Sequence, residues 1–379
     1  MSVHGLCRAL AARGHDVHVY TTSVDGAADS DVPHGEPVEI DGVKVWYYQS
    51  RYARRIYWSP RLAAALDRHV REFAIVHTQA IFLWPLWAAA RAARRAGVPY
   101  VVSPRGMLEK RLVRQKSAWL KSAWLTLVER TNLERASAIH VTSAREAAEA
   151  RAFGFDLPAC VEVPNGVALA ATPVPPFSPA MAALVGDRPF VLCLGRLSWK
   201  KGLDRMLAAL ALTAEARVVI AGGDDEGYRT VLDRIIADLG IQSRVTFVGP
   251  VDGDDKAALL GNARALVLPS YSENFGNVVL EAMAAGCPVV VTPEVGVADM
   301  VAASGVGLVT TGEPAAIAAG ISALLADPAL ARRLGALGRA VAASQFSWDT
   351  AAERMECCYR EILRMSGPAD ANLEPGART

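Results

Sequence analysis

The sequence predicts an α/β protein with two doubly wound domains, each built on a parallel sheet. Short β-branched runs alternate with helical stretches rich in Ala, Leu and Arg through nearly all of the 379 residues. Most of these runs are continuously apolar, which is typical of strands buried on both faces of a parallel sheet. Repetition of strand and helix implies crossover connections between parallel strands. Because the chain is too long for one ordinary core, two domains are expected.

The expected strands are short runs in both halves of the chain. In the first half they are residues 16–21, 43–48, 74–77, 100–103, 138–142 and 161–163. In the second half they are residues 190–194, 217–221, 244–248, 265–268, 288–292 and 307–309. A helix over 3–13 precedes the first of them, whereas a doubly wound domain normally opens with a strand.

A proline-rich stretch marks the expected domain boundary. Residues 171–179 read ATPVPPFSP, with four prolines and no periodicity, which is typical of a linker. We expect an N-terminal domain over 1–172, a linker over 173–183, a C-terminal domain over 184–347, a helix over 348–365 that joins the N-terminal domain, and a disordered polar tail over 366–379.

Charge and composition exclude several classes of protein. The formal net charge of +1 argues against a nucleic-acid binder, and 52% hydrophobic residues indicate a globular protein. Residues 1–170 carry 22 Lys and Arg against 16 Asp and Glu, whereas the remainder carries 18 against 23. The basic first half therefore suggests a domain that meets anionic lipid or phosphate.

The six cysteines have no zinc-ligand or redox spacing, so we expect reduced thiols in a cytoplasmic protein. The longest apolar run, residues 81–90, is far too short to span a bilayer. These observations predict a protein that is soluble or lies on a membrane surface.

The most informative segment is residues 270–285, SYSENFGNVVLEAMAA, which follows the strand at 265–268. Glu273 comes before a helix that starts near Asn277, and Glu281 lies in the first turns of that helix. Open α/β sheets bind ligands at this edge, where a helix N-terminus suits a phosphate. The two carboxylates would repel a diphosphate, so hydroxyl groups are their expected partners. Alternatively, Glu273 is only a charged loop residue, and Glu281 is present because a carboxylate near a helix N-terminus is favoured by the helix dipole.

A second segment, GRLSWKKGLD, follows the strand at 190–194 and begins at Gly195. Its Arg196 and Lys201 lie at a strand-to-helix junction, where two cations can converge on a diphosphate and stabilise it as a leaving group. A solvated basic loop is the alternative. Gly222, after the next strand, supplies a further flexible junction, although no Gly-x-Gly-x-x-Gly fingerprint is present.

The runs GRLSWKKG, AGGDDEG, VTFVGPV and PSYSENFGNVVLEAMAAGCPVV together resemble the donor domain of family 4 glycosyltransferases, which have the two-domain GT-B architecture. The first half is similar to the same family more loosely, through LCRALAARGHDVHVYTT, VHTQ, SPRGML, ASAIHVTSAREA and VPNGV. The resemblance covers residues 5–365, and its most specific mark is the pair Glu273 and Glu281. It implies two Rossmann-like domains that face each other across a cleft.

By that resemblance, Arg196 and Lys201 would hold the donor diphosphate. Glu281 would bind ribose hydroxyls, and Glu273 would contact the transferred hexose. The sugar and phosphates would also meet the backbone of Phe275, Gly276, Asn277 and Val278. The resemblance further implies a nucleotide-diphosphate sugar as donor, a glycan or lipid-linked acceptor, retention of anomeric configuration, and no cofactor or divalent metal.

The first half departs from the family pattern in two places. The family has a strand and a glycine-rich turn before the helix that is residues 3–13 here, so we hypothesise a start site assigned too far downstream. The family also often has a histidine after its fourth N-terminal strand, where this sequence reads Ser103-Pro104-Arg105-Gly106. Arg105 is therefore the expected phosphate contact on the acceptor side. His77, at the end of a strand, is either a second acceptor-side residue or a satisfied structural histidine.

Weaker signals leave alternatives open. The pair Asp224-Asp225 and the cluster Asp252-Gly253-Asp254-Asp255 are interpreted as loop and helix-capping residues, with a metal site as the less favoured interpretation. Residues 51–58, RYARRIYW, and 105–130 combine basic residues with aromatics, which is typical either of a helix on an anionic bilayer or of a solvated face. The basic and Trp residues of the second stretch include Lys110, Arg111, Arg114, Lys116, Trp119, Lys121 and Trp124.

Three functions compete. The favoured one is a hexosyltransferase of surface polysaccharide or lipopolysaccharide biosynthesis, located in the cytoplasm, either free or peripheral on the inner face of the membrane. The others are a nucleotide-sugar epimerase on the same scaffold and a truncated, inactive nucleotide-binding homologue.

Overall fold

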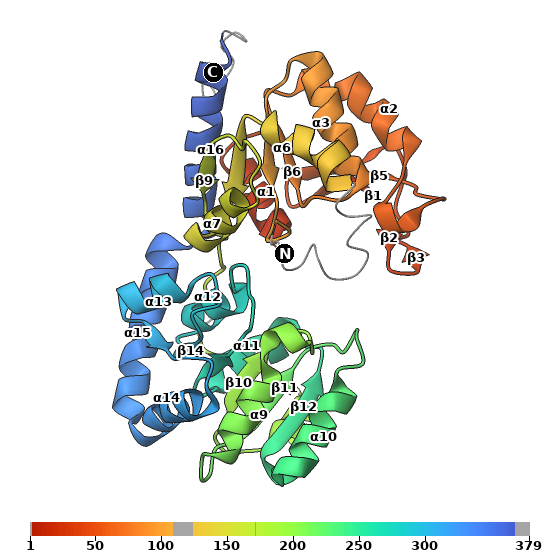
Figure 1. Cartoon of the computed structure of the whole chain (residues 1–379). Coiled ribbons are helices and arrows are strands. Elements are labelled where there is room, and N and C mark those ends of the chain that lie inside the picture. Colours follow the sequence, from red (N-terminus) through yellow and green to blue (C-terminus); the bar gives the residue numbers. More distant parts are fainter. Residues whose placement is uncertain (1, 109–123, 171, 368–379) are drawn as a thin grey trace. The chain divides into compact units, whose positions relative to one another are not determined.

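The computed structural model describes residues 2–108, 124–170 and 172–367, and the chain divides into two compact units (Figure 1). The first unit comprises Met1–Gly166 together with Trp348–Thr379, and the second comprises Val167–Ser347. The fold class is α/β, as predicted, because helices pack against parallel strands in both units.

The second unit contains a six-stranded sheet in which every strand is parallel to its neighbours. The strands are β10 (Val191–Leu194), β11 (Val218–Ala221), β12 (Val245–Gly249), β13 (Leu266–Leu268), β14 (Val289–Val291) and β15 (Gly307–Val309). Their spatial order is β12-β11-β10-β13-β14-β15. Each strand begins and ends within one residue of its predicted range, because a continuously apolar run leaves little choice about which residues are buried.

Helices cover both faces of this sheet, so the second unit is doubly wound as predicted. Leu192 of β10 belongs to one hydrophobic cluster, with α12 (Asn277–Ala284), whereas its neighbour Val191 belongs to another, with α9 (Leu203–Ala211). This alternation follows from the opposite directions of successive side chains on a strand. The other helices of the unit are α8 (Pro179–Val185), η4 (Trp199–Lys201), α10 (Arg229–Leu239), η5 (Gln242–Arg244), α11 (Gly253–Asn262), α13 (Ala298–Ser304), α14 (Pro314–Ala326) and α15 (Pro328–Gln345).

The first unit distributes its strands over separate sheets. One sheet has the order β1-β5-β4 and a second has the order β6-β7-β8-β9, which is all parallel. The strands of these sheets are β1 (His18–Thr22), β4 (Pro37–Ile40), β5 (Val43–Tyr48), β6 (Val76–Gln79), β7 (Tyr100–Ser103), β8 (Ala138–Val141) and β9 (Cys160–Glu162). β1 and β6 are therefore edge strands of two sheets rather than members of one.

The sequence prediction missed three short strands in this unit. β4 pairs antiparallel with β5, and β2 (Val24–Asp25) pairs antiparallel with β3 (Ala28–Asp29). The prediction of purely parallel pairing was wrong here. Most residues of β3 and β4 are exposed and β4 begins with Pro37, so they lack the apolar runs by which the buried strands were found.

The helices of the first unit include one from each end of the chain. They are α1 (Ser2–Ala12), η1 (Arg54–Ile56), α2 (Pro60–His69), η2 (Val70–Glu72), α3 (Trp84–Ala96), the π-helix η3 (Leu125–Glu129), α6 (Arg130–Glu134), α7 (Ala144–Ala152) and α16 (Trp348–Met365). Leu6 and Leu10 of α1 share a hydrophobic cluster with Ala352 and Met355 of α16. The C-terminal helix thus belongs to the core of the first unit.

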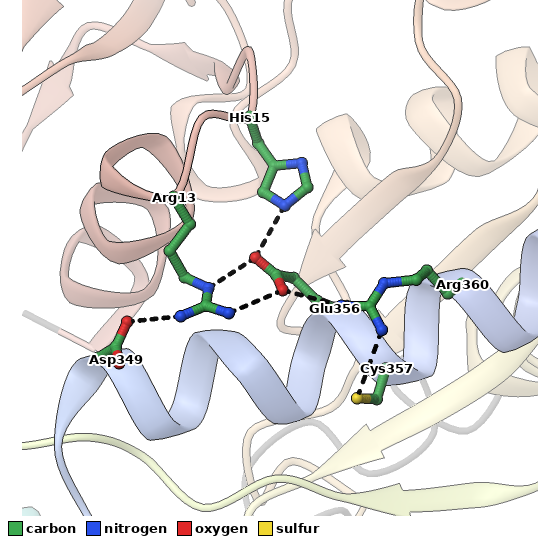
Figure 2. Close-up of polar contacts among 6 residues, drawn as sticks. All are labelled: Arg13, His15, Asp349, Glu356, Cys357 and Arg360. Atoms are coloured by element: carbon green, nitrogen blue, oxygen red, sulfur yellow. Dashed lines mark hydrogen bonds and ion pairs between the residues drawn. The ribbon is translucent and has the colours of Figure 1, made fainter. Parts of the chain in front are cut away.

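A buried carboxylate fixes the same two ends by polar contacts (Figure 2). Glu356 of α16 accepts hydrogen bonds from Nε of Arg13 at 2.7 Å and from NH2 of Arg13 at 3.1 Å, and it contacts Nε2 of His15 at 2.9 Å. The Arg13 hydrogen bond, assisted by His15, lowers the pKa of Glu356 to about 2 despite its burial. His15 is therefore a structural residue.

The predicted boundary and linker need correction. The structure places the boundary at Gly166 and Val167, where Val167 pairs with Ser347, rather than at residue 172. Half of the predicted linker is helix α8, because Ser178 caps its first turn and Pro179 occupies its first position, where a proline is favourable. Met181 and Val185 then bury their side chains in the second unit. The prolines thus mark a helix start as well as a connection.

All six cysteines lie in the described part of the chain and are free thiols. Burial raises the pKa of Cys193 and of Cys287 to about 12, so both remain protonated at neutral pH. They act as small apolar groups in the core of the second unit.

Among the described residues, no single helix has both the length and the apolar composition needed to cross a bilayer. The helices α14 and α15 meet those two requirements only as a pair bent by 100°.

Candidate active site

The candidate site lies at the carboxyl edge of the second unit's sheet. β10 and β13 are neighbours in space although β11 and β12 lie between them in sequence, so strand order reverses between β10 and β13. Ligands of open α/β sheets bind beside such a reversal, because the loops on its two sides turn in opposite directions and leave a crevice. The loops after β10 and β13 are the two segments that carry the predicted site residues.

A cavity of about 380 Å³ is hollowed at this edge. Its walls come from the loops after four strands and from α11 and α12. The lining residues are Leu194, Gly195, Arg196, Lys201, Gly222, Gly223, Pro250, Val251, Lys256, Glu273, Asn277, Val278 and Glu281. The two cations and two carboxylates singled out in the sequence therefore line one cavity, which is large enough for a small-molecule ligand.

Two glycines allow the loops after β10 and β11 to approach each other. A Cβ atom on Gly222, which has φ of 151°, would overlap the carbonyl oxygen of Gly195. A Cβ atom on Gly195, with φ of 147°, would lie 3.3 Å from Cε of Lys201. These positions require glycine both for backbone conformation and for space. Their small size leaves the Lys201 side chain room in the cavity wall.

Lys201 and Glu273 form an ion pair across the strand reversal. Lys201 ends η4, and the loop of Glu273 is tied to that helix because the N–H of Tyr271 donates to the carbonyl of Lys200 at 2.8 Å. On its other side, Glu273 pairs with Val295 in an isolated parallel bridge. Both charged side chains are about one-fifth exposed, so a ligand can reach them.

A second ion pair involves a residue that the sequence analysis missed. Nζ of Lys256 on α11 donates to Oε1 of Glu281 on α12 at 2.8 Å. The two side chains are 19% and 25% exposed and both line the cavity. Lys256 could have been found by the rule used for Arg196 and Lys201, because it too lies soon after a strand, in the first turn of the helix that follows β12.

Arg196 is exposed, and its guanidinium has no ion pair with any residue that the structure describes. The cavity therefore holds three cations and two carboxylates, with both lysines paired. Its surplus of positive charge resides at Arg196. A dianionic ligand would be attracted to this surplus and would compete with the carboxylates for the lysines.

The helix α12 begins at the cavity. Gly276 is its N-cap residue and has φ of 96°, a conformation that glycine adopts without strain. Asn277 and Val278 of its first turn line the cavity, so the partial positive charge of the helix N-terminus faces the same space. Phe275 and Gly276 are not among the lining residues, and Phe275 packs in the core with only 4% exposure.

The acidic pairs weighed as a metal site serve other contacts. Asp224 accepts hydrogen bonds from the backbone N–H groups of Tyr228 at 2.7 Å and of Arg229 at 3.1 Å, at the start of α10. Asp255 accepts from the N–H and the hydroxyl of Ser178, each at 2.8 Å. Within the described ranges, three or more His, Cys, Asp or Glu side chains nowhere gather as a metal would require.

The two acceptor-side candidates lie in the first unit. His77 on β6 has both ring nitrogens occupied, Nδ1 by the hydroxyl of Tyr359 at 2.6 Å and Nε2 by the hydroxyl of Ser103 at 2.8 Å. The Ser103 hydroxyl also contacts Nδ1 of His140 at 2.6 Å. Burial holds the pKa of His77 well below its usual value and lowers that of His140 to about 3, so both are neutral. His77 is thus part of a closed hydrogen-bond chain.

Arg105 follows β7 and is held by two side-chain amides of the first unit. Of the basic region predicted over 105–130, residues 109–123 lie outside the described residues. In the other basic stretch, Tyr52 is 71% exposed. Arg54 is bound to Asp29 of β3 at 2.7 Å.

Comparisons with known proteins agree on the family. The family described as glycosyl transferases group 1 matches residues 178–341, and the glycosyl transferase 4-like domain matches residues 1–166. A D-inositol 3-phosphate glycosyltransferase from Xylanimonas cellulosilytica is 30% identical over 383 residues, which cover 95% of this chain and 90% of the relative.

Solved structures have the same fold. Sucrose-phosphate synthase from Thermosynechococcus elongatus aligns with a TM-score of 0.74 and 26% identity, over 96% of this chain and 93% of that chain. HepE from Anabaena, solved in complex with UDP and glucose, aligns with a TM-score of 0.70 and 20% identity, over 94% and 95% of the two chains.

Proposed function

This chain belongs to the family 4 glycosyltransferases, enzymes of GT-B fold that use a nucleotide-sugar donor, and we propose that it transfers a hexose with retention of anomeric configuration. The observation that carries the proposal is the convergence of Arg196, Lys201, Glu273 and Glu281 on one cavity beside the strand reversal. Cations alone would suit any phosphate, whereas carboxylates beside them suit a ligand that also bears hydroxyl groups.

In this proposal the diphosphate of the donor binds Arg196 and Lys201, near the first turn of α12. The ammonium of Lys201 then exchanges Glu273 for a phosphate oxygen. Glu273, released from its ion pair, accepts a hydrogen bond from a hydroxyl of the hexose. Glu281 accepts a hydrogen bond from the ribose, and Lys256 orients that carboxylate. Support for these roles comes from the two ion pairs, because each places a carboxylate on the cavity wall beside a cation.

The proposed reaction breaks the bond between the anomeric carbon and the leaving phosphate oxygen and forms a bond from that carbon to an acceptor hydroxyl oxygen on the same face. The acceptor proton passes to the leaving phosphate, so no protein nucleophile and no divalent metal is required. Arg196 and Lys201 stabilise the charge that grows on the diphosphate. A cation placed for developing charge contributes about 2–4 kcal/mol to such a transition state.

We further propose that the acceptor is a glycan or a lipid-linked molecule of surface polysaccharide biosynthesis, met by the basic first unit. This would place the enzyme on the cytoplasmic side of the membrane. The name of the Xylanimonas relative specifies a phosphorylated polyol, so a phosphorylated acceptor is a candidate for this chain too.

The proposal is tested by screening UDP, GDP and ADP for thermal stabilisation and then measuring nucleoside diphosphate release from the matching sugar donor. Arg196→Ala combined with Lys201→Ala should lower turnover about 10²–10³-fold. Arg264→Ala, at an exposed arginine of the same unit, is the matched control and should change little. Nucleoside diphosphate release that depends on an acceptor excludes an epimerase. NMR of the product gives the anomeric configuration of the new bond. EDTA should not change the rate of release, because the proposed reaction needs no divalent metal. Wild-type kinetics in the double variant would refute the assignment.

A further inference from the structure

Arg105 is a cation of the first unit that the donor site does not use. Its Nε donates to Oε1 of Gln79 at 2.8 Å, and its NH1 donates to Oδ1 of Asn165 at 2.7 Å. Gln79 ends β6, Arg105 follows β7 and Asn165 follows β9, so all three lie beyond carboxyl ends of one parallel sheet. This is the edge at which open α/β sheets bind ligands.

No described residue forms an ion pair with the guanidinium of Arg105. Both of its partners are uncharged amides, and no carboxylate of a described residue lies within 4.0 Å of it. The charge of Glu146 raises the pKa of Arg105. The carboxylate of Glu146 is itself held by other donors: it accepts hydrogen bonds from the N–H of Gly106 at 2.6 Å and from the N–H and hydroxyl of Thr142 at 2.7 and 2.8 Å. Burial lowers the pKa of Arg105, so desolvation outweighs this attraction.

Hydrogen-bond donors of Arg105 remain available. A guanidinium has five N–H groups, of which the two amides take one each. Among the described residues, the NH2 nitrogen has no hydrogen-bond partner, and Arg105 as a whole is only half-buried. The backbone of Arg105 has φ of 55°, which is strained for a residue with a side chain.

The nearby hydrogen-bond chain adds no charge that could replace a ligand. His77 and His140 lie in the electrostatic field of Arg105, and their low pKa values keep both rings neutral. A buried cation without a counter-ion costs free energy unless an anion joins it. None of the described residues supplies that anion through an ion pair with Arg105.

We propose that Arg105 is the anchor of a second anion site, which binds a phosphate or carboxylate group of the acceptor. The inference rests on the proposed function, because it gives the first unit the acceptor. The amides of Gln79 and Asn165 hold the guanidinium plane, so that its remaining N–H groups present the forked geometry that oxyanions match. The oxyanion belongs either to a soluble phosphorylated acceptor or to the phosphodiester of a lipid carrier.

The test separates this site from the donor site. The protein is first saturated with the nucleoside diphosphate that stabilises it, and inorganic phosphate is then titrated at constant ionic strength while the melting temperature is followed. Wild type should show a further rise, since a ligand that binds only the folded state stabilises it. In Arg105→Met the apparent Kd for phosphate should weaken about tenfold or more. Arg61→Met, at an exposed arginine of the same unit, is the control and should keep the wild-type response.

Stability without phosphate supplies an independent readout. Because no described carboxylate forms an ion pair with Arg105, Arg105→Met should melt at or above the wild-type temperature in phosphate-free buffer. A lower melting temperature together with an unchanged phosphate response would make Arg105 a structural residue and overturn the proposal, as would a wild type without any second response. Arg105→Lys keeps the positive charge but lacks the forked geometry of the guanidinium, so it should bind phosphate several-fold more weakly than wild type. This variant replaces Arg105→Met in the test if the Met variant does not fold.

Two further arms identify the source of the anion. Inositol phosphate that competes with inorganic phosphate in wild type but not in Arg105→Met supports a soluble acceptor. Sedimentation with phosphatidylglycerol vesicles that is lost in Arg105→Met supports a lipid carrier. In every arm, nucleoside diphosphate binding should be unchanged in the variant. Failure of that binding in wild type would instead count against the proposed donor site.

Discussion

The polar groups at the two sheet edges are arranged in opposite ways. In the second unit, charges of both signs lie partly exposed around a cavity, and the ion pairs can exchange partners with a ligand. In the first unit, neutral side chains form a largely buried hydrogen-bond chain near Arg105, which binds two amides and has no ion pair with a described residue. The carboxyl edges of two parallel sheets can therefore carry different polar groups. One edge holds charges already paired with each other, and the other holds a single cation whose described partners are neutral. The first arrangement suits a ligand with phosphates and hydroxyls, and the second suits one anion.

Acidification should separate the two units most strongly. All seven histidines lie in the first unit, where His140 is buried, His77 is half-buried, and desolvation keeps both rings neutral. Their pKa values are lowered in the folded state, so their stabilisation is full above about pH 6.5 and is lost as pH falls, for His140 down to its pKa of about 3. For His140 alone this amounts to about 3 kcal/mol by pH 4.

Hydrogen exchange measured by mass spectrometry, corrected for intrinsic rates, should therefore show peptides of β7 and β8 opening below pH 6 before those of β10 and β11. His140→Gln should flatten this difference, whereas His34→Gln, at an exposed histidine, should not. Equal acid sensitivity of the two units would show that histidine burial does not set the contrast.

Substitutions in the Glu356 cluster of the first unit should lower the free energy of unfolding by a somewhat smaller amount (Figure 2). Arg13 is 29% exposed and binds Glu356 by two nitrogens, so Arg13→Ala should cost about 2 kcal/mol of unfolding free energy. Arg360 contacts the same carboxylate at 3.1 Å but is 50% exposed, so Arg360→Ala should cost at most about 0.5 kcal/mol.

Urea denaturation measures both variants. The pKa of Glu356 is lowered to about 2, so its stabilisation is present above about pH 4.5 and falls away between pH 4.5 and 2. Glu356→Gln should remove that part of the pH dependence. Equal losses for the two arginines would mean that burial does not decide their contributions.

Substitution of Lys256 should have the smallest effect, a change in nucleotide affinity that differs between ribose and deoxyribose nucleotides. Lys256→Met frees Glu281 from its ammonium partner, so nucleoside diphosphate affinity should fall about tenfold, while the 2′-deoxy analogue loses less. Isothermal titration with the two nucleotides gives the ratio directly, and Arg264→Met serves as the matched control. Equal losses of affinity for both nucleotides would mean that Lys256 contacts the phosphates and does not act by orienting Glu281.

The sequence alone was enough to predict the α/β fold class, the buried strands of the second unit and four side chains that the structure places around one cavity. Continuous apolar runs such as residues 218–221 have one favourable placement, buried between helices, and polar residues that follow such runs must lie at the carboxyl edge of the sheet. Arg196, Lys201, Glu273 and Glu281 were therefore recognisable from their positions after strands.

Only the tertiary structure decided which of these groups meet and which do not. The order β10-β13 creates the strand reversal, and no local pattern encodes the neighbour of a strand. The same holds for the Lys256–Glu281 pair, for helix α8 within the predicted linker, and for exposed edge strands such as β4. The Arg105 site depends on amides that follow β6 and β9, far apart in sequence, because parallel strands gather their ends through long crossovers.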